Sequence, residues 1–144
     1  MKKVIEELNE FLEGNYMAIH TYDQYIFHCD DKKTKQLLQK IQQQHKEHAA
    51  MIAERIQNLG GIPVHDVGLT GKMAEMAAKI KRTKDTISMI KDAISGETRG
   101  IETSKKILDG DLDEESLRIV KEILKRDEEH VKLLKNYLNG SAAE

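Results

Sequence analysis

Six polar residues stand where their side chains would meet inside a helical bundle and could hold a metal ion. They are Asn15, His45, His48, Glu97, Asp127 and His130. The first two histidines are three residues apart, and so are the last two residues, so each pair shares one face of a helix. Imidazole nitrogens and carboxylate oxygens are ligands of iron, manganese and zinc. The three histidines and two carboxylates therefore form a candidate metal-ligand set.

A buried hydrogen-bond network is the alternative to a metal at these positions. A charged side chain in an apolar core is costly unless it pairs with another group or binds a metal. For any one histidine taken alone, mutual hydrogen bonding is the better interpretation. Two pairs with the same spacing, related by one internal repeat, favour a metal.

That repeat relates the two halves of the chain. A shift of 82 residues, the difference between 14 and 96, superposes Gly14 on Gly96, Ile19 on Ile101, Asp31 on Asp113, Ile41 on Ile123 and His48 on His130. It also relates Asn15 to Glu97 and His45 to Asp127. Any two amphipathic helices share apolar positions, so the matched Gly, Asp and His carry the evidence. We expect two similar hairpins about a pseudo-two-fold axis, with equivalent polar positions facing one another.

Four long amphipathic segments would carry these residues. Apolar residues at spacings of three, four and seven predict four helices. The first covers about 2–29, and the second starts at Asp30 and Asp31 and ends at Gly60. The third ends at Gly110, and the fourth runs from Asp113 to Gly140. Short connections imply two antiparallel hairpins, over about 2–59 and about 84–139. The stretch of about 60–83 holds the only proline and is a long crossover, with a short helix over 73–81. We expect one all-α domain over residues 1–144, a four-helix bundle.

Composition narrows the function classes. The 144 residues carry a net charge of −2, with basic residues spread along the chain, so nothing indicates a nucleic-acid partner. No apolar run is long enough to span a membrane, and the N-terminus lacks an apolar signal core. We therefore expect a cytoplasmic protein. Cys29 is the only cysteine and has no internal disulfide partner.

The residues around these ligands resemble those of ferritin-like di-iron proteins. A Glu from each of two helices and a Glu-x-x-His from each of the other two is the ligand set of that family. The run His48-Ala49, Glu54-Arg55-Ile56, Leu59, Gly61, Pro63 resembles the end of the second helix of bacterioferritins, and Leu12 through Tyr22 resembles their first helix. The resemblance covers most of the chain. It implies a ferritin-like four-helix bundle of two antiparallel helical hairpins joined by a long crossover.

The resemblance also implies ligand roles. Glu97 would be a terminal carboxylate ligand, His48 and His130 the nitrogen ligands, and Asp127 a bridging carboxylate. Asn15 and His45 depart from the pattern, because each stands where the family has a carboxylate. An amide is a weaker, uncharged ligand, so the set suits one well-held ion or an asymmetric pair.

The function implied is iron binding, with oxidation of Fe(II) by dioxygen or peroxide as in bacterioferritin-like and rubrerythrin-like proteins. Manganese and zinc stay open. Lys46 stands where the haem-binding methionine of bacterioferritins would be, so we expect no haem. The alternative is a metal-poor or zinc-holding bundle that acts as a dimeric interaction module.

Two further expectations concern tyrosines and assembly. Tyr22 lies seven residues after Asn15 on the same face; a core tyrosine is the better interpretation, and a neighbour of the metal ligands is the alternative. Because no fifth helix follows the fourth, we expect a homodimer that buries surface of the first two helices, including Tyr25 and Phe27.

Overall fold

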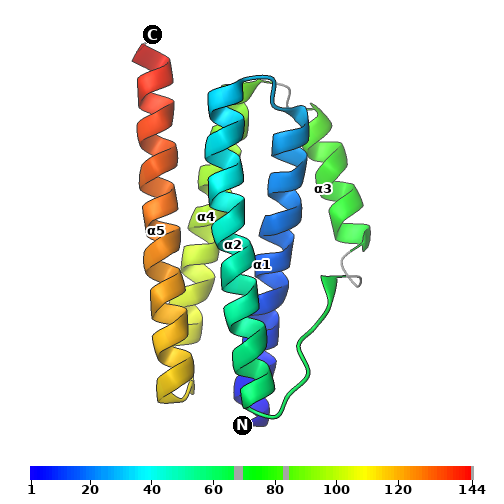
Figure 1. Ribbon diagram of the computed structural model, residues 1–144, viewed down its shortest axis with the longest axis vertical. Coiled ribbons are helices and arrows are strands. Elements are labelled where there is room, and N and C mark those ends of the chain that lie inside the picture. The colour runs from blue at the N-terminus through cyan, green and yellow to red at the C-terminus, as the bar shows by residue number, and fades with distance from the viewer. Residues whose placement is uncertain (67–69, 83–84, 144) are drawn as a thin grey trace.

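Five helices make up the described part of the chain. The computed structural model describes residues 1–66, 70–82 and 85–143, and no strand occurs among them. The helices are α1 (Lys2–His28), α2 (Lys32–Asn58), α3 (Thr70–Arg82), α4 (Thr86–Leu108) and α5 (Glu114–Ala143). The four long helices stand side by side, and α3 lies against the outside of α1 (Figure 1). The all-α bundle predicted from the sequence is confirmed.

Short, capped connections fold the long helices into two antiparallel hairpins. Only three residues separate α1 from α2, and a carboxylate oxygen of Asp31 accepts the backbone N–H of Thr34 at 2.9 Å. The equivalent Asp113 accepts the backbone N–H of Ser116 at 3.2 Å at the start of α5. A side-chain acceptor at this place satisfies one of the free N–H groups of the first helical turn. The sequence repeat is therefore a repeat of helix caps as well.

The crossover leaves α2 through a glycine turn. Gly60 has a φ of 86°, the left-handed region that glycine adopts without a Cβ clash. The N–H groups of Gly60 and Gly61 bond the carbonyls of Gln57 and Ile56, which closes the helix in a Schellman motif. The short helix predicted over 73–81 is α3, which begins earlier. The predicted junction of crossover and second hairpin, at 83 and 84, lies outside the described residues.

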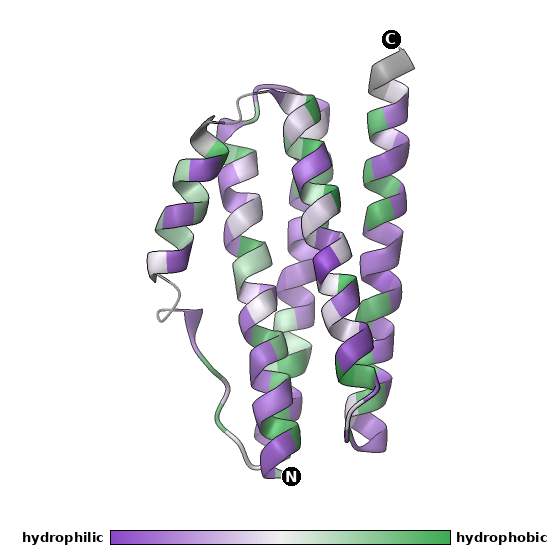
Figure 2. Cartoon of the chain, turned by 180° about the vertical axis from the view of Figure 1, so that it is seen from behind, coloured by the Kyte–Doolittle hydropathy of each residue, from purple (hydrophilic) through white to green (hydrophobic). Residues whose placement is uncertain are grey.

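Two apolar clusters fill the bundle at different heights. One contains Leu8, Leu12, Ile52, Ile56, Val120 and Ile123, and the other contains Tyr22, Leu38, Ile41, Met89, Ile90 and Leu134. Along each long helix the candidate ligands fall between the residues of these clusters. In Figure 2, hydrophobic and hydrophilic residues alternate along each helix, as expected for helices with one buried face. The polar layer is thus closed above and below by apolar packing.

Two details of the prediction are wrong. The last helix runs on to Ala143 instead of ending at Gly140, because Gly140 does not take the positive φ of a helix-ending glycine. Tyr25 is only 2% exposed and packs inside the chain, so it offers no surface to a second copy. Phe27 is 79% exposed.

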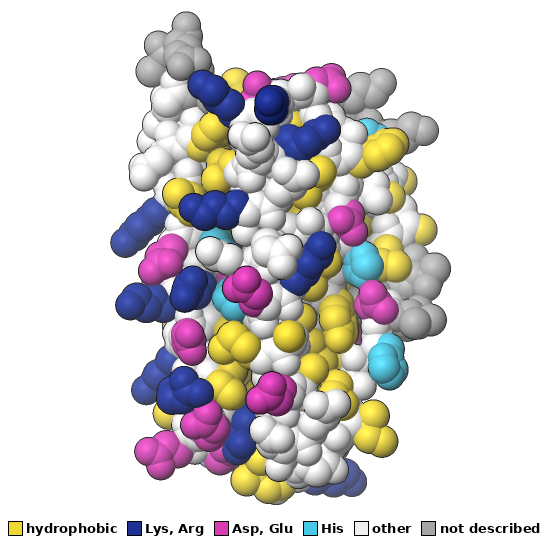
Figure 3. Space-filling model, viewed as in Figure 1, with side chains coloured by type: hydrophobic (Ala, Val, Ile, Leu, Met, Phe, Trp, Pro, Cys, Tyr) yellow, Lys and Arg dark blue, Asp and Glu magenta, His cyan; other side chains and the backbone are white. Residues whose placement is uncertain are grey.

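The surface carries both charges. On the face shown in Figure 3, Lys and Arg side chains are interspersed with Asp and Glu side chains. None of the described helices has the length and apolar character needed to cross a membrane.

Candidate metal centre

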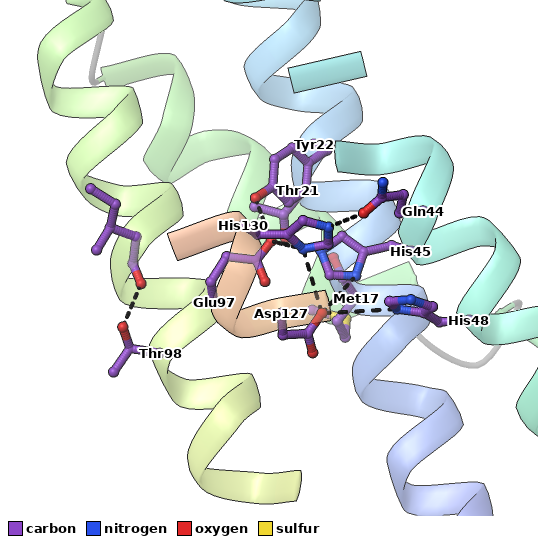
Figure 4. A network of polar contacts seen from close by, with 11 residues as sticks. Met17, Thr21, Tyr22, Gln44, His45, His48, Glu97, Thr98, Asp127 and His130 are labelled. Carbon is purple, nitrogen blue, oxygen red and sulfur yellow. Dashed lines mark hydrogen bonds and ion pairs between the residues drawn. The ribbon is translucent and has the colours of Figure 1, made fainter. Parts of the chain in front are cut away.

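Four buried side chains from three helices meet in the middle of the bundle. His45 comes from α2, Glu97 from α4, and Asp127 and His130 from α5 (Figure 4). One ligand atom of each lies within 4.8 Å of the corresponding atoms of the others, and no side chain of the four belongs to a residue more than 5% exposed. Helical periodicity aims all four inward, since each lies on the apolar face of its helix.

Glu97 is the most heavily bonded member of the group. Its Oε1 accepts a hydrogen bond from the Tyr22 hydroxyl and another from His45 Nε2, each at 2.7 Å. The Nδ1 atom of His130 lies 3.4 Å from the same oxygen. The contact with Tyr22 places this tyrosine directly behind the carboxylate, as a neighbour of the predicted metal ligands. These bonds fix the orientation of the carboxylate within the site.

Gln44 orients the ring of His130. The side-chain oxygen of Gln44 lies 2.5 Å from His130 Nε2, and an amide oxygen can only accept, so Nε2 carries a proton. Nδ1 then faces Asp127 Oδ1 at 3.5 Å with its lone pair available when the ring is neutral. Gln44 was not among the site residues predicted from the sequence. Neither the repeat nor the apolar pattern marks it, because its side chain is only partly buried.

His48 and Asn15 lie beside the four-residue group. His48 is 5% exposed, and its Nδ1 is 3.9 Å from Asp127 Oδ1. The Asn15 side-chain nitrogen donates to the carbonyl oxygen of Phe11 at 2.9 Å, one turn back along α1. All six sequence-predicted residues are buried, and four of them lie close enough to share one ion. That any of them binds a metal stays a prediction.

Several buried polar atoms of the site have no hydrogen-bond partner among the described residues. They are Nδ1 of His45, His48 and His130 and Oδ1 of Asp127. A buried polar atom left unpaired costs free energy, and protein cores rarely contain several together. Nitrogen and carboxylate donors of this kind fit a transition-metal ion such as iron, manganese or zinc. The residues present therefore fit a metal.

Comparison with known proteins defines the family. The family described as "Domain of unknown function (DUF2383)" matches residues 3–110. The chain belongs to this family. No match was found among curated proteins.

Solved structures place the fold in the ferritin-like superfamily. A dodecameric thioferritin, the bacterioferritin-related protein from Bacteroides fragilis, is 26% identical with a TM-score of 0.81, over 99% of this chain and 88% of that one. The ferritin-like part of a two-domain protein from Anabaena variabilis, which also contains a DJ-1/ThiJ/PfpI-like domain, is 21% identical with a TM-score of 0.78. That match covers 96% of this chain and 39% of the other. The ferritin-like bundle inferred from the sequence is confirmed.

The pKa values of His48 and His130 are shifted in opposite directions from the usual value for histidine. Burial, together with charge on His45 and His130, lowers the pKa of His48 to about 4. Burial would also lower the pKa of His130, but its contacts with Asp127 and Glu97 raise it to about 9. In the metal-free protein His130 is therefore protonated at neutral pH. A metal that bound its Nδ1 would displace that proton.

The two carboxylates differ as well. Burial would raise the pKa of Glu97, but the ion pair with His130 and the hydrogen bond from His45 outweigh it and hold this pKa well below the usual range. Burial raises the pKa of Asp127, because the ion pair with His130 at 3.5 Å offsets only part of the cost. The site thus keeps at least one ionised carboxylate at neutral pH, which a cation needs.

Proposed function

We propose that this chain is an iron-binding protein of the ferritin-like superfamily, with the ion held by His45, Glu97, Asp127 and His130. The observation that carries the proposal is the convergence of four buried side chains, three of which, His45, Asp127 and His130, have a buried atom without a hydrogen-bond partner among the described residues. His48 stands near enough to join by a small rotation of its ring toward Asp127.

Oxidation of Fe(II) by dioxygen or peroxide is the activity we propose for the site. Bound iron would supply the electron that the oxidant accepts. The protein's own part is to hold the donors: Tyr22 fixes Glu97 by a 2.7 Å bond, and Gln44 fixes the ring of His130. Manganese or zinc would fit the same donors, and the nitrogen-rich set favours one ion or an asymmetric pair over a symmetric di-iron centre.

Metal analysis of the purified protein tests the proposal. The protein is prepared without added metal, its iron, manganese and zinc are measured, and Fe(II) is then added in air while ferric absorbance is followed. We expect at least one iron per chain and faster oxidation than in buffer. Substituting Glu97→Gln together with His130→Gln should abolish both. Glu102→Gln, an exposed position on the same helix, is the matched control.

A zinc-holding or metal-poor dimeric module is the second candidate. The hydrogen bond from Asn15 to Phe11 favours it, because it occupies the side chain at a position where the resemblance implies a carboxylate ligand. Iron bound without oxidation, or zinc retained after purification, would support this function over the first. A homodimer stays our proposal for the assembly, with a twelve-chain assembly like that of the thioferritin as the competing possibility. A cytoplasmic location likewise stays a proposal.

A further inference from the structure

A cavity of about 600 Å³ lies between α1, α3 and α4 and reaches the candidate metal centre. Four polar residues of the centre line it, namely Asn15, His45, Glu97 and Asp127. Small-molecule sites in proteins typically have volumes of roughly 300–1,000 Å³, whereas one water molecule occupies about 30 Å³ of liquid. The cavity is therefore far larger than dioxygen or peroxide requires.

The space exists because side chains are missing on two of its helices. Gly14, Gly96 and Gly100 line the cavity. A Cβ atom at Gly14 or Gly100 would meet no atom within 4 Å, and one at Gly96 would meet only the end of Arg99, at 3.8 Å. Gly14 and Gly96 are partners in the internal repeat, so both hairpins leave this space open. Glycine is unfavourable inside a helix, and nothing else in their surroundings requires it here.

The open side of the metal centre is the side that faces the cavity. Asn15 and His45, the two positions that depart from the di-iron pattern, both line the cavity, whereas His48 and His130 do not. Asn15 is 7% exposed, and its side-chain oxygen makes no hydrogen bond with the described residues. A metal held by His45, Glu97, Asp127 and His130 would have four protein ligands and would keep a coordination position free toward the cavity, which three of these residues line. Asn15, the departure that is not among the four ligands, leaves this side of the site open to an outside ligand.

The proposed metal favours an anion, and the cavity wall favours an apolar body. Outside the metal ligands, the charged lining residues are Lys72, Lys79 and Arg99 together with Glu75 and Asp92, and Lys72 pairs with Glu13 at 3.1 Å. A divalent metal would offset the charges of Glu97 and Asp127 and would itself be the cation that an anionic ligand meets. Much of the remaining wall is apolar, with side chains such as Phe11, Met17, Met76 and Ile80. An apolar chain against this wall would be removed from water.

From these observations we propose that the metal binds a small organic carboxylate, whose oxygen takes the free coordination position and whose apolar body fills the cavity between α1, α3 and α4. The proposal rests on the metal site proposed above and names a ligand for it. It gives the departures at Asn15 and His45 a role, since two more carboxylates there would crowd and repel the ligand.

Cobalt-loaded protein separates this proposal from the metal site itself. Co(II) is added to the metal-free full chain and its visible absorption spectrum is recorded, which reports the coordination of the ion. Acetate, hexanoate and hexylammonium are then titrated in turn. We expect hexanoate to shift the spectrum and to bind at least tenfold more tightly than acetate, since each buried methylene group adds about fourfold in affinity. Hexylammonium should leave the spectrum unchanged.

Cavity-filling variants provide the structural control. Gly100→Leu or Gly14→Leu should keep cobalt binding and lose the preference for hexanoate over acetate, because the leucine occupies the space. Gly140→Leu places the same side chain on a helical glycine that also has no atom within 4 Å but lies outside the cavity, and should behave as wild type. Two cavity variants are used so that a folding defect in one leaves the other to decide.

The outcomes distinguish the two proposals. If cobalt does not bind, both the metal site and its ligand are wrong. If cobalt binds but hexanoate leaves the spectrum unchanged, or is no tighter than acetate, only the ligand proposal is overturned. Equal binding of hexylammonium, or an undiminished hexanoate preference in both cavity variants, would overturn it as well.

Discussion

His48 and His130 lie in one polar layer, yet their surroundings drive their pKa values to opposite sides of 6.5, to about 4 and about 9. His48 is buried without a close carboxylate partner, so its neutral form is favoured. His130 lies 3.4 and 3.5 Å from two carboxylates, so its charged form is favoured. A difference in pKa between folded and unfolded states makes stability depend on pH.

We expect the metal-free protein to be most stable near pH 6.5. The contribution of His48 is present above its unfolded pKa of 6.5 and is lost as the pH falls toward about 4. The contribution of His130 is present below 6.5 and is lost as the pH rises toward about 9, a loss on the order of 3 kcal/mol. Thermal midpoints measured from pH 4 to pH 9 with a chelator present would show the loss of stability on both the acid and the alkaline side.

Two variants with neutral side chains test which histidine causes the loss of stability on each side of the pH profile. His48→Gln should flatten the acid side and leave the alkaline one, and His130→Gln should do the reverse. If both variants keep the wild-type profile, other groups control the pH dependence and this account of the two histidines is wrong.

Restoring carboxylates at the two departures should increase metal binding. In Asn15→Glu, His45→Glu the new carboxylates would stand beside Glu97, whose Oε1 is 2.7 Å from His45 Nε2 in the natural protein. Like charges there repel one another without a metal, so the apo thermal midpoint should fall while the metal-bound midpoint rises. Metal stoichiometry under anaerobic Fe(II) should rise above that of wild type.

The matched control for that variant is Asn15→Gln, His45→Gln, which has the same size without the charge. It should bind no more metal than wild type. Our interpretation of the two positions fails if wild type already binds two irons per chain, or if the Glu and Gln variants bind metal equally.

At the residue scale, inward-facing positions could be predicted from the sequence, and bonding partners could not. The helical period places Asn15, Glu97 and Asp127 on apolar faces, and all three are buried. The period says nothing of what a side chain meets across the bundle. The bond from His130 to Gln44 depends on the relative height of α2 and α5, which the packing of the two hairpins sets.

Among the elements, the two helix caps form a second repeat that crosses between hairpins. The Tyr137 hydroxyl, from α5, donates to the cap carboxylate of Asp31 at 2.9 Å. Arg55, from α2, donates to the cap carboxylate of Asp113 at 2.5 Å. Tyr137 is the residue that the repeat relates to Arg55. Each cap therefore starts its own helix and also ties that helix to the long helix of the other hairpin.

Removing one of these cap aspartates should lower the free energy of unfolding more than removing an exposed aspartate that caps no helix. Asp113→Ala would lose the helix cap and leave Arg55 without its carboxylate partner, so we expect a loss of roughly 1–2 kcal/mol in the free energy of unfolding. Asp109→Ala, an exposed residue in the same connection, should change it by less than about 0.5 kcal/mol. Equal losses in chemical denaturation would contradict the role of the cap.

Element boundaries could be predicted where a local motif fixes them. The turn at Gly60 is followed within three residues by Pro63, which cannot continue a helix, and the helix ends there. The same reasoning is wrong at Gly140, where Ser and Ala follow and the helix continues. A glycine alone does not end a helix. The helix ends where a residue that cannot continue it, such as Pro63, follows the glycine.

For the whole molecule, light scattering of the purified protein tests the assembly. We expect two chains per particle. Phe27, which is 79% exposed at the end of α1, is the part of the sequence-predicted contact surface that remains available, so Phe27→Ser should weaken association on dilution. Exposed Lys33→Ser, across the same connection, is the control. A particle of twelve chains, or a dimer unaffected by Phe27→Ser, would count against this contact.

A bound metal should stabilise the fold by linking the two hairpins through its ligands. Glu97, Asp127 and His130 belong to the second hairpin, and His45 brings in the first through α2. A ligand that binds only the folded state at 100 times its Kd adds about 2.7 kcal/mol, which is roughly 8 °C in Tm for a chain of this size. The rise should be reversed by a chelator.

Hydrogen exchange would show whether the metal links both hairpins or is held by the second hairpin alone. If His45 is a ligand, metal should slow exchange in the middle of α2 as well as in α4 and α5, because opening either hairpin would break a metal bond. In His45→Gln, which keeps the three ligands of the second hairpin, protection by metal should remain in α4 and α5 and decrease in α2. Protection confined to α4 and α5 in the wild type would mean that the metal is held by one hairpin alone, and that His45 serves only as a hydrogen-bond partner of Glu97.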